Sequence, residues 1–350
     1  GDHILLRLQK TRLNTQDLTD LLVQYFAVKS VDIGYCGLKD RNAVTDQWLS
    51  VHLPGRTGKV LAELDSSSFT STITSKLSAD NATDVRLLEA AAHHRKLRVG
   101  AHRANRFTLT LRNIDGDVAQ LEECFLSLGQ RGFPNYFGEQ RFGYQARNLY
   151  RAHSWFTEAR VLADAISTQQ SAAGTKGRTR VRRKMSRTQR SLYLSAARSF
   201  LFNFLLGNRI QSDTWLSPLP DEPLILEGSR SHFVPDAGPD QRPELLARIK
   251  TLDIHTSGVL WGLAAEATAH GQYERNLLSA YSDMLQGLER EEVKAARRAL
   301  RAVPRGLVFS QEFAGVAKLE FELPAGVYAT SLLREIVVDL RNAGFTAGDG

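Results

Sequence analysis

Strand patterns occur at both ends of this chain, and a long helical block separates them. Apolar residues alternate in "HILLRLQK" near the start, and strand patterns return after Pro304 in "GLVFSQEF" and "AKLEFELP". Between them, residues 156–303 repeat apolar residues mainly at helical spacing. This order predicts a discontinuous sheet domain of residues 1–155 and 304–350, interrupted by a helical insertion domain of residues 156–303.

Local patterns predict the individual elements of a mixed α/β (α+β) protein. Before the block we expect strands at "HILLRLQK", "VDIGY", "WLSVHL" and "NRFTLTLRNI", and helices at "NTQDLTDLLVQYFAV" and residues 118–128. Within the block we expect long helices at "RAHSWFTEARVLADAI", "QRSLYLSAARSFLFNFLLGNRI" and "YERNLLSAYSDMLQGLEREEVKAARRAL". A closing helix is expected in "GVYATSLLREIVVDL".

The charge balance favours an anionic partner. The chain has 45 Lys and Arg against 38 Asp and Glu, which gives a net charge of +7. Nucleic acid is the first candidate partner and a membrane surface the second. No stretch approaches the roughly 20 apolar residues that span a bilayer, so we expect no membrane-spanning segment. Two cysteines are too few for a disulfide framework, which makes a reducing cytoplasm the expected compartment.

Several catalytic motifs are absent from the sequence. It has no GxxxxGK[ST] loop, GxGxxG, GxSxG elbow, HExxH or CxxC. Nucleotide-driven, redox and serine-hydrolase functions therefore lose their usual support, and we expect no nucleotide cofactor and no metal. The chain opens at "GDHILLRLQK" without Met, so we also expect that an upstream segment was trimmed or left out. No dimerisation motif was found, and a monomer is expected.

A basic segment follows the first helix of the block. Residues 176–190 contain eight Lys or Arg, and such a run is either a solvated loop or a nucleic-acid contact. In the second case it would add salt-dependent affinity without reading sequence. The RNA-binding candidates in it are Arg178, Arg180, Arg182, Arg183 and Lys184.

"GYCGLKDRNAVTDQW" places a Lys-Asp pair in a glycine-containing turn between two expected strands. Lys39 and Arg41 flank Asp40, and two cations favour the ionised carboxylate. An ionised, shielded carboxylate can act as a nucleophile. An Asp in such a turn can equally cap a backbone amide, so the turn alone leaves both roles open.

"PNYFGEQRFG", residues 134–143, interleaves aromatic and polar residues between glycines. Its rings can be core residues of a bent strand, or one of them can stack on a nucleobase while an amide binds the base edge. The last motif, "LPAGVYATSLLREIVV", predicts a buried helical stripe of Leu333, Ile336, Val337 and Leu340. Arg334 borders that stripe and needs an anion, for which Asp40, Glu335 or a surface carboxylate would serve.

Four motifs together resemble the tRNA pseudouridine synthase D family. They are "GLKDRNAVTDQW", "NYFGEQRFG", "LSAARSFLFN" and "LPAGVYATSLLRE", which occur in the family's order over nearly the whole chain. The resemblance implies a pseudouridine synthase catalytic domain with a mainly antiparallel mixed sheet and a helical insertion. It assigns Asp40 as the catalytic aspartate and Asn135, Phe137 and Tyr328 as the uridine site. Supporting residues would be Lys39, Arg334, Gln140 and Arg141.

The implied reaction converts a uridine in tRNA to pseudouridine, at position 13 in bacterial members, without a cofactor. The carboxylate would attack the sugar C1′ or uracil C6, or act as a base in glycal formation, and the sequence leaves these three routes open. The family also has an upstream "PEDF"-like segment with a further substrate-facing Phe and a basic residue, which would lie before Gly1. The alternative function is a noncatalytic RNA-binding protein or RNA chaperone that uses the same basic and aromatic surfaces.

Overall fold

The structure, a computed structural model, describes residues 1–77, 83–169, 185–235 and 242–341. The basic segment with the candidates Arg178 to Lys184 lies outside these residues. The described chain divides into an N-terminal unit, Gly1–Ala104 with Arg341, and a larger unit, Asn105–Leu340. Each unit is described by itself below.

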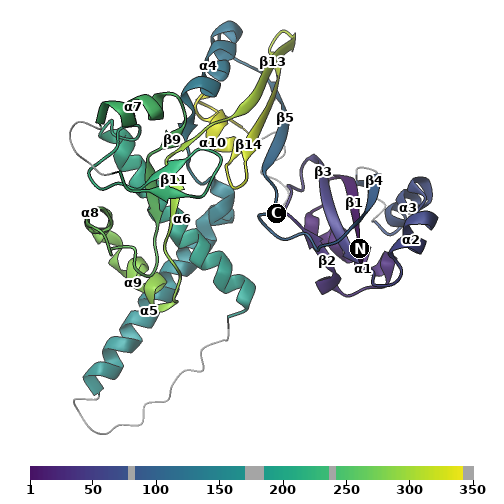
Figure 1. Ribbon diagram of the computed structural model, residues 1–350, viewed down its shortest axis with the longest axis horizontal. Coiled ribbons are helices and arrows are strands. Elements are labelled where there is room, and N and C mark those ends of the chain that lie inside the picture. The colour runs from purple at the N-terminus through teal and green to yellow at the C-terminus, as the bar shows by residue number, and fades with distance from the viewer. Residues whose placement is uncertain (78–82, 170–184, 236–241, 342–350) are drawn as a thin grey trace. The chain divides into compact units, whose positions relative to one another are not determined.

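The N-terminal unit is built on a four-stranded antiparallel sheet with the strand order β2-β3-β1-β4 (Figure 1). The expected strands are present, and helices pack beside them. The elements are β1 (His3–Thr11), α1 (Thr15–Phe26), β2 (Ile33–Tyr35), β3 (Val44–His52), α2 (Thr57–Glu63), α3 (Ser66–Thr74) and β4 (Asp84–His93).

Alternation along β1 decides which side chains enter the core of this unit. Ile4, Leu6 and Leu8 are each fully buried, and Lys10 follows them at the same two-residue spacing. The helix α1 begins where Asn14 Oδ1 accepts a hydrogen bond of 2.8 Å from the Asp17 amide, an N-cap that satisfies a free helix donor. The strand therefore carries one lysine inward, at its end nearest the Lys39–Asp40 turn.

The larger unit joins sequence from both sides of the helical block in one sheet. β13 (Arg305–Phe313) and β14 (Val316–Pro324) form a hairpin, and β14 neighbours β5 (Ala104–Arg112) in the order β13-β14-β5. The helix α4 (Val118–Arg131) packs against β13 (Figure 1). The hydrophobic core around this sheet and helix contains Phe125, Phe133 and Phe321. The short strand β6 (Phe133–Pro134) pairs with β12 (Arg301–Ala302), and the "NYFG" motif directly follows β6 in the chain.

Helices dominate the middle of this unit. The long helices α5 (Arg147–Gln169) and α6 (Arg187–Gln211) pack together, with Phe156 and Trp261 fully or almost fully buried in their core. The remaining elements are β7 (Leu224–Leu226), β8 (His232–Phe233), α7 (Arg242–Lys250), β9 (Ile254–His255), β10 (Ser257–Leu260), α8 (Ala269–Leu277), α9 (Ser282–Arg290), β11 (Ala296–Ala299) and α10 (Ala329–Leu333).

Two helix predictions are wrong in extent. The expected long helix from Tyr273 to Leu300 breaks after Leu277 and ends at Arg290, and its "KAARRAL" part forms β11, which pairs with β10. Pairing with a neighbouring strand here overrides the helix propensity of Ala and Arg. The closing helix α10 is also short, because turns follow Leu333.

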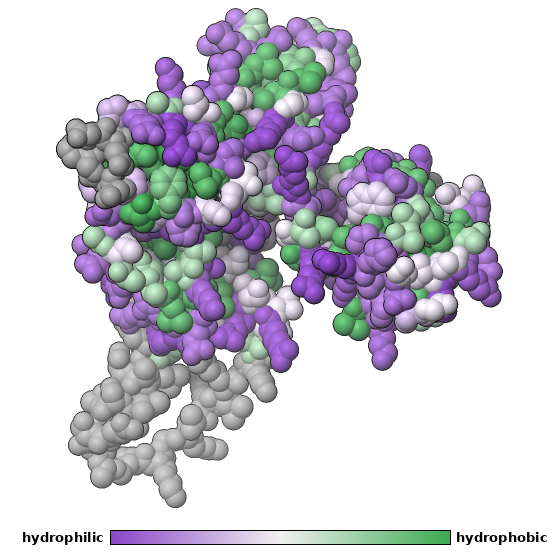
Figure 2. All heavy atoms as spheres, viewed as in Figure 1, coloured by the Kyte–Doolittle hydropathy of each residue, from purple (hydrophilic) through white to green (hydrophobic). Residues whose placement is uncertain are grey.

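The mixed α/β class with antiparallel sheets is confirmed. Within the described residues, no helix combines the length and the apolar character needed to cross a membrane. On the face drawn in Figure 2, hydrophilic side chains interleave with smaller groups of hydrophobic ones in both units.

Candidate active site

The Lys39–Asp40 turn lies between β2 and β3 in the N-terminal unit. Asp40 is exposed, and its carboxylate forms no hydrogen bond or ion pair with other described residues. Its backbone carbonyl is held instead: Lys10 Nζ donates a hydrogen bond of 2.8 Å to it. The backbone of the turn is thus held by Lys10, while the carboxylate of Asp40 has no partner among the described residues.

Buried polar groups of the sheet and of α1 support the same turn. Thr15 Oγ1 accepts a hydrogen bond of 2.9 Å from the Lys39 amide and donates one of 3.3 Å to Gln47 Oε1. Thr15 and Gln47 are 1% and 6% exposed. Because donors and acceptors buried away from water are costly to leave unpaired, these bonds hold the turn in one conformation.

A buried and a partly buried lysine dominate the electrostatics of the turn. Burial lowers the pKa of Lys10 to about 8, although Asp40 opposes that shift and Lys39 adds to it. Burial also lowers the pKa of Lys39, which Cys36 and Asp40 counteract. Two ammonium groups near one carboxylate make a local positive field around Asp40.

A second cluster forms in the larger unit around the "NYFG" motif. Asn135 and Phe137 are 5% and 8% exposed. The amide of Phe137 donates a hydrogen bond of 2.8 Å to Asn203 Oδ1, and Asn203 Nδ2 returns one of 2.9 Å to the Phe137 carbonyl. Asn135 Nδ2 donates to the Ala299 carbonyl at 2.9 Å. The motif is therefore fixed by the "LSAARSFLFN" helix and by β11.

The C-terminal motif packs directly against this cluster. The ring centroids of Phe137 and Tyr328 lie 6.0 Å apart in an edge-to-face arrangement, and Ser331 Oγ donates 3.0 Å to the Tyr136 carbonyl. A Cβ on Gly138 would lie 2.8 Å from Tyr328 Cδ1, so only glycine permits this approach. Asn135, Phe137 and Tyr328, which come from two motifs far apart in the sequence, thus lie together.

Arg298, which the sequence analysis did not single out, lies in the middle of this cluster. Its guanidinium carbon is 4.0 Å from the Phe137 ring centroid, and Nη2 donates to Asn135 Oδ1 and, at 3.0 Å, to the Gly326 carbonyl. Arg141 stands over the same ring, with its guanidinium carbon 5.4 Å from the centroid. No sequence spacing reveals Arg298, because its partner Asn135 is 163 positions away.

The other two candidates of the larger unit are more exposed. Arg334 forms an ion pair with Glu139 of the "NYFGEQRFG" motif, and the two side chains are 59% and 81% exposed. Glu139 is therefore the anion that the structure provides for Arg334. Gln140 is exposed at the start of the same short 3₁₀ helix, Glu139–Phe142.

Lys10 and Asn203 are also absent from the sequence-based candidates. Lys10 had a readable signal, because it continues the inward face of Ile4, Leu6 and Leu8. Asn203 ends the "LSAARSFLFN" motif, and only the fold shows that it holds the backbone of Phe137.

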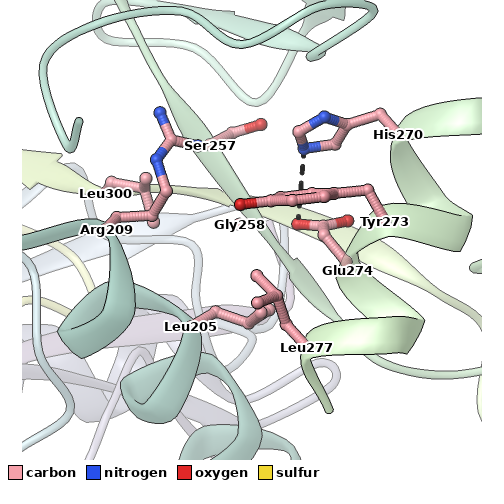
Figure 3. Close-up of a pocket in the computed structure, with 9 residues that line it drawn as sticks. All are labelled: Leu205, Arg209, Ser257, Gly258, His270, Tyr273, Glu274, Leu277 and Leu300. Carbon is pink, nitrogen blue, oxygen red and sulfur yellow. Dashed lines mark ion pairs between the residues drawn. The ribbon is translucent and has the colours of Figure 1, made fainter. Parts of the chain in front are cut away.

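A separate small cavity lies between α6, α8 and β10 (Figure 3). Its volume of about 10 Å³ holds one water molecule at most, which excludes a nucleoside. Figure 3 shows His270 facing Glu274, at 3.8 Å between Nε2 and Oε1. None of the candidate residues lines it, and we regard it as structural. In the described part of the chain, no group of three or more His, Cys, Asp or Glu could hold a metal ion.

Comparison with known proteins identifies the family. The family model of tRNA pseudouridine synthase D (TruD) matches residues 1–155 and 157–336. The chain is similar to proteins named tRNA pseudouridine synthase D. That of Xanthomonas euvesicatoria pv. vesicatoria is 38% identical, and the match covers 98% of this chain and 86% of the relative. That of Nitrosococcus oceani is 37% identical, and the match covers 96% of this chain and 84% of the relative.

A solved structure gives the same fold. The crystal structure of a putative tRNA pseudouridine synthase D from Methanosarcina mazei has a TM-score of 0.59 and 21% sequence identity, and the match covers 96% of this chain and 88% of that one. The chain therefore belongs to the tRNA pseudouridine synthase D family.

Proposed function

We propose that this protein is an RNA-modifying isomerase that converts a uridine of tRNA, at position 13, to pseudouridine, with Asp40 as its catalytic carboxylate. The convergence of Asn135, Phe137 and Tyr328 in one cluster is the observation that supports this function best. It joins an amide to aromatic rings, the combination expected where an extruded base is held.

In the net reaction the bond between C1′ and uracil N1 breaks and a bond between C1′ and uracil C5 forms. N1 gains a proton and C5 loses one, so no atoms enter or leave. We assign three roles to this chain's residues: Asp40 provides the carboxylate, the Phe137–Tyr328 pair confines the detached uracil while it turns, and Asn135 orients the cluster through its bonds to β11. Supporting roles fall to Lys39 beside Asp40, to Arg141 beside the rings, and to Gln140 and Arg334.

We further propose the discontinuous organisation, with residues 1–155 and 304–350 as the catalytic domain and 156–303 as the insertion. The pairing of β5 with β14 across the helical block supports it. The tRNA is the proposed partner, bound in part through Arg178, Arg180, Arg182, Arg183 and Lys184. We expect a cytoplasmic monomer that needs no cofactor.

The test is to incubate the full-length protein with unmodified bacterial tRNA and to map pseudouridine along it. We expect stoichiometric modification at position 13. RNA binding without any pseudouridine would overturn the proposal and leave the noncatalytic RNA-binding function.

A further inference from the structure

Two arginines beside the aromatic cluster have no carboxylate partner within the described residues. The guanidinium carbons of Arg141 and Arg298 lie 5.4 and 4.0 Å from the centroid of the Phe137 ring, so both charges stand at one ring. Arg141 is also 5.9 Å from the Tyr328 centroid. The nearest acid in sequence, Glu139, is paired with Arg334 instead.

Two other enclosed arginines of this unit meet a carboxylate. Arg209 pairs with Glu222 at 3.1 Å, and Arg297 pairs with Glu274 at 2.5 Å. Arg198 and Arg301 have no carboxylate partner among the described residues. Arg198 donates three bonds of 2.9 Å to backbone carbonyls instead, and Arg301 donates to His255 Nδ1 and to the Ile249 and Ile254 carbonyls. The Arg141–Arg298 pair differs from all of these, because two like charges share one site without a counter-charge.

The hydrogen bonds of the pair also leave donor capacity. Arg141 Nη1 donates a hydrogen bond of 2.9 Å to Ser195 Oγ, but its Nε is buried and has no acceptor among the described residues. Burial lowers the pKa of Arg298 to about 9, with Tyr328 opposing the shift and Arg141 adding to it. The charged guanidinium of Arg298 is desolvated and lies near a second cation, Arg141, which still has an N–H donor to offer. A bound anion would stabilise both charges and accept that hydrogen bond.

We propose that Arg141 and Arg298 form an anion site that binds one backbone phosphate next to the target uridine. This inference rests on the proposed function, since it takes the ring of Phe137 as the place where the uracil is held. A phosphate accepts several hydrogen bonds and matches the planar fork of arginine. Held at Phe137, it would fix the ribose that carries the base and so limit which nucleotide reaches the rings.

The test uses tRNA with a single neutral methylphosphonate linkage, placed either 5′ or 3′ of the target uridine. We expect one of the two placements to weaken binding to the wild-type protein about tenfold, the loss of one charge-assisted contact. In Arg298→Gln and Arg141→Gln, binding of ordinary tRNA should fall by a similar factor, and the methylphosphonate should cause no further loss. Each variant should also lower the slope of log affinity against log salt by about 1.

Arg248→Gln is the matched control, because that arginine is already paired with Asp253 at 2.7 Å and has no role in the proposed site. It should keep both the methylphosphonate effect and the salt slope. The inference is wrong if neither linkage affects wild-type binding, or if the methylphosphonate weakens the Arg141 and Arg298 variants as much as the wild type. Should one glutamine variant not fold, the other decides by the same comparison with the wild type. Binding is measured without turnover, so absent pseudouridine would count against the proposed function only.

Discussion

Lys10 Nζ donates a 2.8 Å hydrogen bond to the backbone carbonyl of Asp40, from a side chain with no exposed surface. A lysine at the inward end of β1 therefore anchors the turn that presents the proposed catalytic carboxylate. The bond ties a carbonyl rather than the carboxylate, which leaves both carboxylate oxygens of Asp40 available.

Lys10→Met should lower kcat about tenfold, because the turn loses its anchor, equal to about 1.4 kcal/mol of barrier. Pseudouridine formation under saturating tRNA measures it. Lys59→Met, which removes an exposed partner of Glu63 in the same unit, should leave kcat within about twofold. Equal kcat for Lys10→Met and wild type would contradict the anchoring role.

The free energy of unfolding of the wild type should rise between pH 8 and 10.5, because folding shifts the pKa of Lys10. Folding lowers the pKa of Lys10 from 10.5 to about 8, so in this window the unfolded chain binds a proton that the folded chain does not. The burial penalty of the charged form is thus present below pH 8 and relieved above it. Chemical denaturation over this range should show a smaller rise in Lys10→Met than in wild type. Part of the rise remains in the variant, because burial also lowers the pKa values of Lys39 and Arg298.

Asn203→Ala should destabilise the protein by about 1–3 kcal/mol and lower kcat, because two bonds to the Phe137 backbone are lost. Asn208→Ala on the same helix removes a single bond to the Phe204 carbonyl and serves as the control. Denaturant melts and turnover assays of both variants test this. If Asn208→Ala proved as damaging to kcat as Asn203→Ala, the clamp on Phe137 would not matter for activity.

Glu227→Gln should cost about 1–2 kcal/mol at pH 7, a value discounted because the carboxylate is partly exposed. His255 and Arg305 hydrogen-bond Glu227 and lower its pKa from 4.5 to about 2. That contribution is fully present above pH 4.5 and is lost as the pH falls toward 2. The difference between wild type and Glu227→Gln should therefore shrink over this range, whereas the exposed Glu312→Gln should match wild type throughout. A difference that stays constant with pH would contradict the assignment.

Local pattern was sufficient for most of the sheet framework. Alternation located β1, β5 and β14, and the Asn14 cap marked the start of α1. The local pattern did not predict the structure of segments that pair with distant parts of the chain. The "KAARRAL" segment has helical composition but becomes β11 through pairing with β10.

The candidate site follows the same division. The turn with Asp40 and the "NYFG" motif were visible as short motifs, since their residues are adjacent in sequence. The position of Arg298 in the site could not be predicted from sequence, because its partners Asn135 and Gly326 belong to other segments. The anion of Arg334 could not be chosen among several carboxylates until the fold brought Glu139 to it.

The role of Asp40 is tested most directly by pseudouridine formation at tRNA position 13 in single turnover with the full-length protein. Asp40→Asn keeps the size and the backbone carbonyl of the residue, and Asp46→Asn removes an exposed carboxylate of the same unit. We predict that Asp40→Asn binds tRNA with near wild-type affinity but loses at least about 1,000-fold in rate, equal to about 4 kcal/mol, while Asp46→Asn stays within about threefold. An Asp40→Asn variant that modifies tRNA as fast as Asp46→Asn would contradict the account.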